Sequence, residues 1–96
     1  MVLTIKFFAA LRDITGRREQ ELALAKSGAT VRAILNKLST KYGKNFREYI
    51  FDQREKTIRP QISIMINGQG LKNPESLNAR LKDGDIMAIL PPISGG

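Results

Sequence analysis

The chain has 96 residues and carries sixteen basic against nine acidic ones, which gives a net charge of +7. Hydrophobic residues make up 42% of the sequence and charged residues 26%, a composition typical of a folded domain and too apolar for disorder. At this length we expect a single domain, residues 1–96, with one small core. Cysteine and histidine are absent, which excludes disulfides, thiol chemistry and metal sites built from thiolates or imidazoles.

The acidic residues give no sign of a catalytic site. They are scattered along the sequence, and Asp83 and Asp85 flank Gly84 in a pattern typical of a turn. We therefore expect a protein that is not an enzyme, with no catalytic residues and no metal site. The N-terminal sequence alternates like a strand and lacks a signal-peptide cleavage site, and no stretch approaches the roughly 20 apolar residues of a membrane span. The resulting prediction is a cytoplasmic protein without a membrane partner.

The periodicity predicts the order strand, strand, helix, strand, strand. A first strand is expected from Val2 to Ala9, with its odd positions facing the core. A second strand is expected from Gln20 to Ala25. The pair Thr15-Gly16 predicts a turn that joins the two strands in a hairpin.

A helix follows, and its apolar residues share one face. Thr30 can cap its first turn, and Gly43 suits its end. The apolar positions are Val31, Ile34, Leu35, Leu38 and Tyr42. One apolar stripe predicts one buried face, packed against a sheet.

The second half of the chain predicts an excursion and further strands. Residues 44–60 combine a short helical pattern, built on Phe46, Tyr49 and Ile50, with a charged loop. A strand through residues 62–66 ends at the turn signal Asn67-Gly68.

Three short segments close the domain. Gly70 allows a bulge before a short edge strand near Leu71. Leu77 to Leu81 fits a single helical turn. The last strand is expected from Asp85 to Leu90, with Met87 and Ile89 facing the core.

The last six residues form a segment of their own: Pro91, Pro92, Ile93, Ser94, Gly95 and Gly96. Terminal glycines pack poorly, because glycine has no side chain and loses the most entropy when ordered. They provide instead a thin, flexible tail, 91–96, that ends in a carboxylate and can enter a channel too narrow for a Cβ. The two prolines favour an extended course, so the tail can reach roughly 20 Å into a partner. The alternative is a frayed or truncated end.

Several segments resemble a known family. They are residues 5–12 (IKFFAALR), residues 29–31, residues 66–68 and the C-terminal block 81–96, in which D-G-D precedes an apolar strand and P-P-x-x-G-G. In these segments the chain resembles the small subunit of molybdopterin synthase and its ThiS-like and archaeal modifier relatives. The resemblance spans the whole chain. The resemblance implies an α+β, ubiquitin-like β-grasp fold, a mixed four- to five-stranded sheet packed on one main helix, with the first and last strands adjacent and parallel. The segment 44–60 is longer than in compact bacterial members.

The resemblance also implies a chemistry for the tail. A ubiquitin-activating-like adenylyltransferase would use ATP and magnesium to adenylate Gly96, and a persulfide would then displace AMP and leave a thiocarboxylate. The sulfur donor acts in trans, since the chain has no sulfur nucleophile and binds no cofactor itself. The molybdopterin synthase large subunit would be a partner. The rival function is a modifier that forms isopeptide bonds between Gly96 and lysines of target proteins, and a third is an interaction domain with an inert tail.

Strand alternation predicts a partner interface. If the odd positions of the first strand face the helix, Phe8 points away from the core, and the same phasing puts Met65, Ile86 and Leu90 outside on neighbouring strands. Apolar residues gathered on one sheet near the tail suggest a docking patch. Family resemblance supports Phe8 and Leu90 more than the other two. The alternative is that residues 44–60 shield this face.

The net charge has two interpretations. Arg17-Arg18, Lys37, Lys41, Lys44 and Arg47 could cluster into an RNA-binding surface. However, the sequence has no RNA-recognition motif or interleaved aromatic platform. We therefore do not expect a nucleic-acid partner, and we interpret the charge as a solvated surface or as complementary to an acidic partner.

Overall fold

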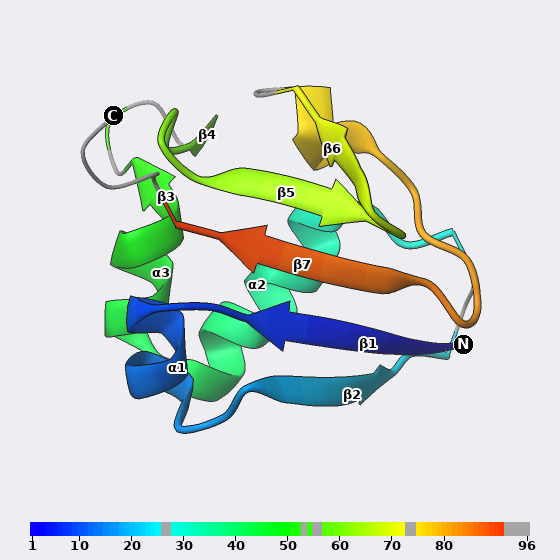
Figure 1. Cartoon of the computed structure of the whole chain (residues 1–96), viewed down its shortest axis with the longest axis horizontal. Coiled ribbons are helices and arrows are strands. Elements are labelled where there is room, and N and C mark those ends of the chain that lie inside the picture. The colour runs from blue at the N-terminus through cyan, green and yellow to red at the C-terminus, as the bar shows by residue number, and fades with distance from the viewer. Residues whose placement is uncertain (26–27, 53, 55–56, 73–74, 92–96) are drawn as a thin grey trace.

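The fold is a mixed sheet with helices on one side, as predicted. The computed structural model describes residues 1–25, 28–52, 54, 57–72 and 75–91. In Figure 1 the sheet forms the front layer and the helices lie behind it. In spatial order the strands are β2 (Glu19–Ala23), β1 (Val2–Phe7), β7 (Ile86–Leu90), β5 (Ser63–Ile66) and β6 (Gln69–Leu71). Strands β1 and β7 are adjacent and parallel, and the other neighbours are antiparallel.

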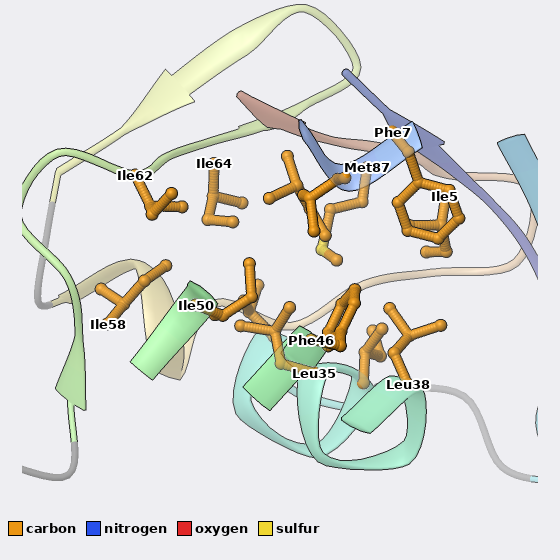
Figure 2. Close-up of a cluster of buried hydrophobic side chains, with 14 of the residues drawn as sticks. Ile5, Phe7, Leu35, Leu38, Phe46, Ile50, Ile58, Ile62, Ile64 and Met87 are labelled. Atoms are coloured by element: carbon orange, nitrogen blue, oxygen red, sulfur yellow. The ribbon is translucent and has the colours of Figure 1, made fainter. Parts of the chain in front are cut away.

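The core lies between the inner face of the sheet and the main helix, α2 (Val31–Tyr42). The odd positions of β1 point inward, as predicted, and Leu3, Ile5 and Phe7 are fully buried. Met87 and Ile89 of β7 are buried beside them. Figure 2 shows Ile5, Phe7 and Met87 on the sheet side of the core, above Leu35, Leu38 and Phe46. Burying each of these side chains contributes about 1.5–3 kcal/mol.

Helix α2 begins and ends at the predicted residues. The Thr30 hydroxyl oxygen accepts a hydrogen bond from the Ala33 N–H at 3.2 Å, which satisfies one of the free donors of the first turn. Gly43 ends the helix with φ at 92°, a value that glycine adopts readily.

The connection between β1 and β2 differs from the prediction. A short helix, α1 (Ala10–Thr15), replaces the tight hairpin turn, and Gly16 ends that helix with φ at 72°. The first strand stops at Phe7 because Ala9 leaves the extended region, with φ at 51°. The two strands still pair antiparallel, from Val2↔Ala23 to Lys6↔Glu19.

Residues 44–58 add a helix and a small hairpin to the core. Helix α3 (Lys44–Ile50) contains the predicted helical turn. Strands β3 (Phe51–Asp52) and β4 (Thr57–Ile58) pair at the base of the predicted charged loop, of which residues 53, 55 and 56 lie outside the described residues. Phe46, Ile50, Phe51 and Ile58 are buried in the main core. The described part of this excursion therefore packs on the helix side of the sheet and leaves the outer face open (Figure 1).

The hairpin of β5 and β6 has the predicted turn but not the predicted bulge. Asn67 and Gly68 both have positive φ, 51° and 84°, as a two-residue type I′ turn requires. Gly70 sits in an unbroken ladder opposite Met65, so the expected bulge was wrong.

The remaining helical turn, η1, spans Glu75–Asn78, slightly before the predicted position. No helix among the described residues is long and apolar enough to cross a bilayer.

Candidate functional site: the tail exit and the outer sheet face

The chain leaves the sheet at the end where β1 and β7 both stop, which we call the exit edge. These strands are parallel, and their last pair is Phe7↔Ile89. The next residues along, Phe8 and Leu90, therefore lie at the same edge, and both are half-buried. Pro91 follows with no N–H to extend the sheet and is the last described residue. The rest of the predicted tail, residues 92–96, lies outside the described residues.

Strand β7 is fixed at the opposite end by hydrogen bonds to Asp85. The Lys82 N–H donates to Asp85 Oδ2 at 2.7 Å, and the Asn67 amide donates to Asp85 Oδ1 at 2.9 Å. The backbone hydrogen bond from Lys82 and the side-chain bond from Asn67 lower the pKa of Asp85. Asp83 Oδ1 accepts from the Val2 N–H at 2.7 Å. The interpretation of both aspartates as turn residues is confirmed, and they anchor the strand that leads to the tail.

The outer face of the sheet carries an apolar strip along β7. Ile86, Ala88 and Leu90 alternate with the buried Met87 and Ile89. Met65 lies beside the strip, because β5 pairs Met65 with Ala88. We call Phe8, Met65, Ile86, Ala88 and Leu90 the sheet-face patch.

The predicted interface residues spread along this patch rather than gathering at the exit. Phe8 and Leu90 lie at the exit edge, whereas Ile86 lies at the far end of β7, about 13 Å away at 3.3 Å per residue. Ile86 is also the most exposed residue of the patch, at 40%. Val2, which is 46% exposed, lies on the same face of β1. We did not select Val2 from the sequence, although its position follows from the same alternation.

Arg12 supports the exit edge from α1. Its Nε donates to the Phe7 carbonyl oxygen at 3.1 Å, and its guanidinium lies 5.4 Å from the centre of the Phe8 ring. Between these residues, Ala9 adopts φ 51° and ψ −126°, which an L side chain rarely adopts. A strained residue beside the exit was not visible in the sequence, because alanine carries no conformational signal.

Tyr42, on the helix side of the sheet, also has a shifted pKa. Burial raises the pKa of Tyr42, with a smaller opposing effect from Arg17. The Tyr42 hydroxyl donates to the Gln20 side-chain oxygen, and its ring packs edge-on against Phe7 at 5.8 Å. Across the described ranges, no three His, Cys, Asp or Glu residues are grouped so as to hold a metal ion.

Known proteins share this arrangement over nearly their full length. Small archaeal modifier protein 3 of Haloferax volcanii is 27% identical over 96 residues and covers 100% of both chains. The solution structure of small archaeal modifier protein 1 from Methanosarcina acetivorans is 38% identical, with a TM-score of 0.77 over 99% of this chain and 96% of that one. A Pyrococcus furiosus structure named "Putative molybdopterin converting factor, subunit 1" is 27% identical, with a TM-score of 0.73 over 97% and 99%. The ThiS family model matches residues 5–96, and the chain therefore belongs to the ThiS family.

Proposed function

We propose that this protein is a sulfur carrier, of the kind represented by the small subunit of molybdopterin synthase, and that the Gly96 carboxyl group carries the sulfur. The family match over residues 5–96, which includes the closing glycines, is the observation that carries the proposal. The likeness to the Pyrococcus furiosus protein named for molybdopterin conversion favours that branch of the family.

The chemistry needs groups that this chain lacks. An oxygen of the Gly96 carboxylate attacks the α-phosphorus of ATP, and magnesium pyrophosphate leaves. A persulfide sulfur then attacks the acyl carbon of the adenylate, and AMP leaves with the bonding electron pair. A thiol reduces the resulting acyl disulfide, which leaves a thiocarboxylate on Gly96 and a disulfide on the donor. Because the sequence has no cysteine, partner proteins supply the persulfide, the thiol and the acid and base groups.

The fold supplies a rigid base and a surface for those partners. The parallel ends of β1 and β7 hold the start of the tail, and five residues follow Pro91. Those five residues can reach about 17 Å when extended. A partner that takes in the tail would cover the exit edge, where Phe8 and Leu90 offer half-buried apolar surface of the kind found in interface cores. Such a partner, first the adenylyltransferase and then the synthase large subunit, would contact the sheet-face patch.

Intact-mass measurement tests the carrier function. The protein is coexpressed with the cognate adenylyltransferase and a sulfur source and then purified, and its intact mass is measured by mass spectrometry. We expect a species in which one oxygen is replaced by sulfur, and we expect deletion of Gly96 to abolish it without lowering the melting temperature. Omission of the adenylyltransferase is the control. An unchanged mass in the complete system would refute the proposal.

Protein modification is the second candidate function. The two relatives named as small archaeal modifiers favour it. It uses the same adenylate, but a lysine amine of a target protein attacks the acyl carbon in place of sulfur. Diglycine remnants on lysines of other proteins, lost when Gly96 is deleted, would support this function. If neither product forms, the protein is an interaction domain with an inert tail.

A further inference from the structure

The net charge is concentrated in one stretch of the sequence. Between Glu21 and Glu48 there are six basic residues and no acidic ones. The rest of the chain holds the other ten basic residues and all nine acidic ones, which nearly balance. Six of the seven excess charges therefore belong to this stretch.

The structure places five of these charges on the outward side of α2 and on α3, and the sixth, Lys26, lies outside the described residues. Helix α2 buries Val31, Ile34, Leu35 and Leu38 against the sheet. Its exposed positions include Lys37 and Lys41, which are four residues apart and therefore neighbours on the helix surface. Lys44 and Arg47 continue the series on α3 and are exposed as well. We call Lys37, Lys41, Lys44 and Arg47 the basic stripe.

The stability of the fold does not account for the basic stripe. Two like charges four residues apart destabilise a helix by about 0.2–0.5 kcal/mol, and α2 has no acidic residue to offset them. The Lys44 amine lies 3.7 Å from the Glu48 carboxylate, but the Lys44 side chain is 83% exposed, so the pair contributes little. Lys41 lies over the Tyr42 ring at 5.6 Å. Lys41 and Arg47 lie in the last turns of α2 and α3, where the helix dipole favours a cation. Lys37, however, neighbours Lys41, and Lys44 begins α3, where the dipole disfavours a cation. The fold therefore does not explain the whole stripe, which points to a role in binding.

The stripe runs along the back of the molecule toward the tail exit. Helix α2 lies behind the sheet (Figure 1), so its outward side faces away from the sheet-face patch. Tyr42, at the end of α2, packs against Phe7, and Phe7 is paired with Ile89 at the exit edge. A partner that encloses the tail at this edge can therefore reach Lys41 and Lys44 from the same side.

We propose that the basic stripe binds an acidic protein surface beside the tail channel of the adenylyltransferase that activates Gly96. This proposal rests on the proposed function. Lysine side chains act as hydrated point charges and attract acidic surfaces over a distance. This attraction depends strongly on the salt concentration, because salt screens it. The exposed residues of α2 are Arg32, Ala33, Asn36, Lys37, Thr40 and Lys41. They include no aromatic side chain on which an unpaired base could stack, which favours a protein over single-stranded nucleic acid.

Two matched double variants test the stripe. Lys37→Gln/Lys41→Gln removes two charges from α2, and Lys72→Gln/Lys82→Gln removes two exposed lysines that follow β6 and precede β7. Glutamine keeps the helix propensity of lysine, and loss of the like-charge pair should leave the melting temperature unchanged or slightly raised. The readout is ATP–pyrophosphate exchange that depends on this protein. It is measured at about 10 mM salt, where the screening length is about 30 Å, and at about 1 M, where it is about 3 Å.

At low salt we expect the α2 variant to lose about tenfold in kcat/KM with kcat unchanged, and we expect the loss to vanish at high salt. The control pair should stay within about twofold of the wild type. Equal effects of the two variants, or wild-type kinetics that do not depend on salt, would overturn the proposal while leaving the proposed function intact. Absence of any exchange with the wild type would instead refute the proposed function, and with it this partner.

Fluorescence anisotropy in the same buffers measures binding of a 20-base-pair RNA duplex. If the α2 variant lost RNA binding while its pyrophosphate exchange stayed unaffected, the stripe would be assigned to nucleic acid and the proposal would be overturned.

Discussion

Replacement of Asp85 by alanine tests how the strand that leads to the tail is held. Asp85 is 8% exposed and accepts hydrogen bonds from the Lys82 N–H and the Asn67 amide. The substitution leaves both donors without this acceptor. A hydrogen bond to a charged group contributes about 1.5–3 kcal/mol. Since water can reach the exposed Asn67 side chain, we expect a loss of about 2–4 kcal/mol in the free energy of unfolding at neutral pH.

Urea unfolding at a series of pH values separates this effect from simple loss of packing. The pKa of Asp85 is lowered in the folded protein, so its contribution to stability is present above its unfolded value of about 3.9 and is lost as the pH falls through the folded value. The difference between wild type and Asp85→Ala should be constant between about pH 5 and 8 and should shrink below about pH 4. Asp83→Ala is the control, because Asp83 is exposed and accepts a hydrogen bond from the Val2 N–H, and the substitution should cost about 0.5–1.5 kcal/mol. A pH-independent difference, or equal costs for the two variants, would refute the assigned role of Asp85.

Three further changes test other parts of the account. Ala9→Gly should raise the free energy of unfolding by about 1 kcal/mol, since Ala9 has φ at 51° and such strain costs about 1–3 kcal/mol. The control, Ala10→Gly in α1, should lower the free energy of unfolding by about 0.5–1 kcal/mol. If thermal unfolding showed that both variants stabilise the protein, the strain at Ala9 would be contradicted. Phe46→Ala should lower the free energy of unfolding in urea by about 3–5 kcal/mol, because Phe46 is fully buried and its ring centre lies 6.3 Å from that of Phe7. A loss below about 1 kcal/mol would show that residues 44–58 do not form part of the core. Leu90→Ser should lower kcat/KM for adenylate formation about tenfold or more by ATP–pyrophosphate exchange, with urea unfolding as the check on folding, and unchanged kinetics would exclude Leu90 from the interface.

The sequence predicted the elements that have a strong period or a local signal. The stripe of α2, its Thr30 cap and its Gly43 stop are local features that the fold preserves. The alternation of β1 and β7 predicted which residues are buried, because one face of each strand must contact the helices. The Asn67-Gly68 turn was visible because both positions need positive φ.

The short elements were not predictable from local pattern. Helix α1 has six residues, too few to show a period, and it starts after an alanine whose positive φ only tertiary contacts can impose. The β3–β4 ladder pairs two residues with two, which also gives no periodic signal. Gly70 was assigned a bulge because glycine often marks one, yet here it faces Met65 across an ordinary pair.

The candidate site was partly predictable for the same reason. Alternation placed Phe8, Met65, Ile86 and Leu90 outside the core, and the length of the last strand already separates Ile86 from the exit. Alternation could not show that Phe8 lies next to Leu90. The register of the parallel β1–β7 pair, which is a long-range feature, determines that proximity. Lys37, Lys41, Lys44 and Arg47 were recognised from the sequence as part of a possible cluster that also included Arg17-Arg18. The position of Lys37 and Lys41 on the side opposite the patch follows only from the packing of α2 behind the sheet (Figure 1).

Localisation of the sulfur atom tests the central claim most directly. The protein is purified after coexpression with its adenylyltransferase and a sulfur source, and the intact chain is fragmented in a mass spectrometer. The account predicts that every fragment containing Gly96 carries one sulfur in place of one oxygen, and that fragments ending before Gly96 have their unmodified mass. Sulfur located on any other residue, or a Gly96 fragment of unmodified mass in the activated protein, would contradict it.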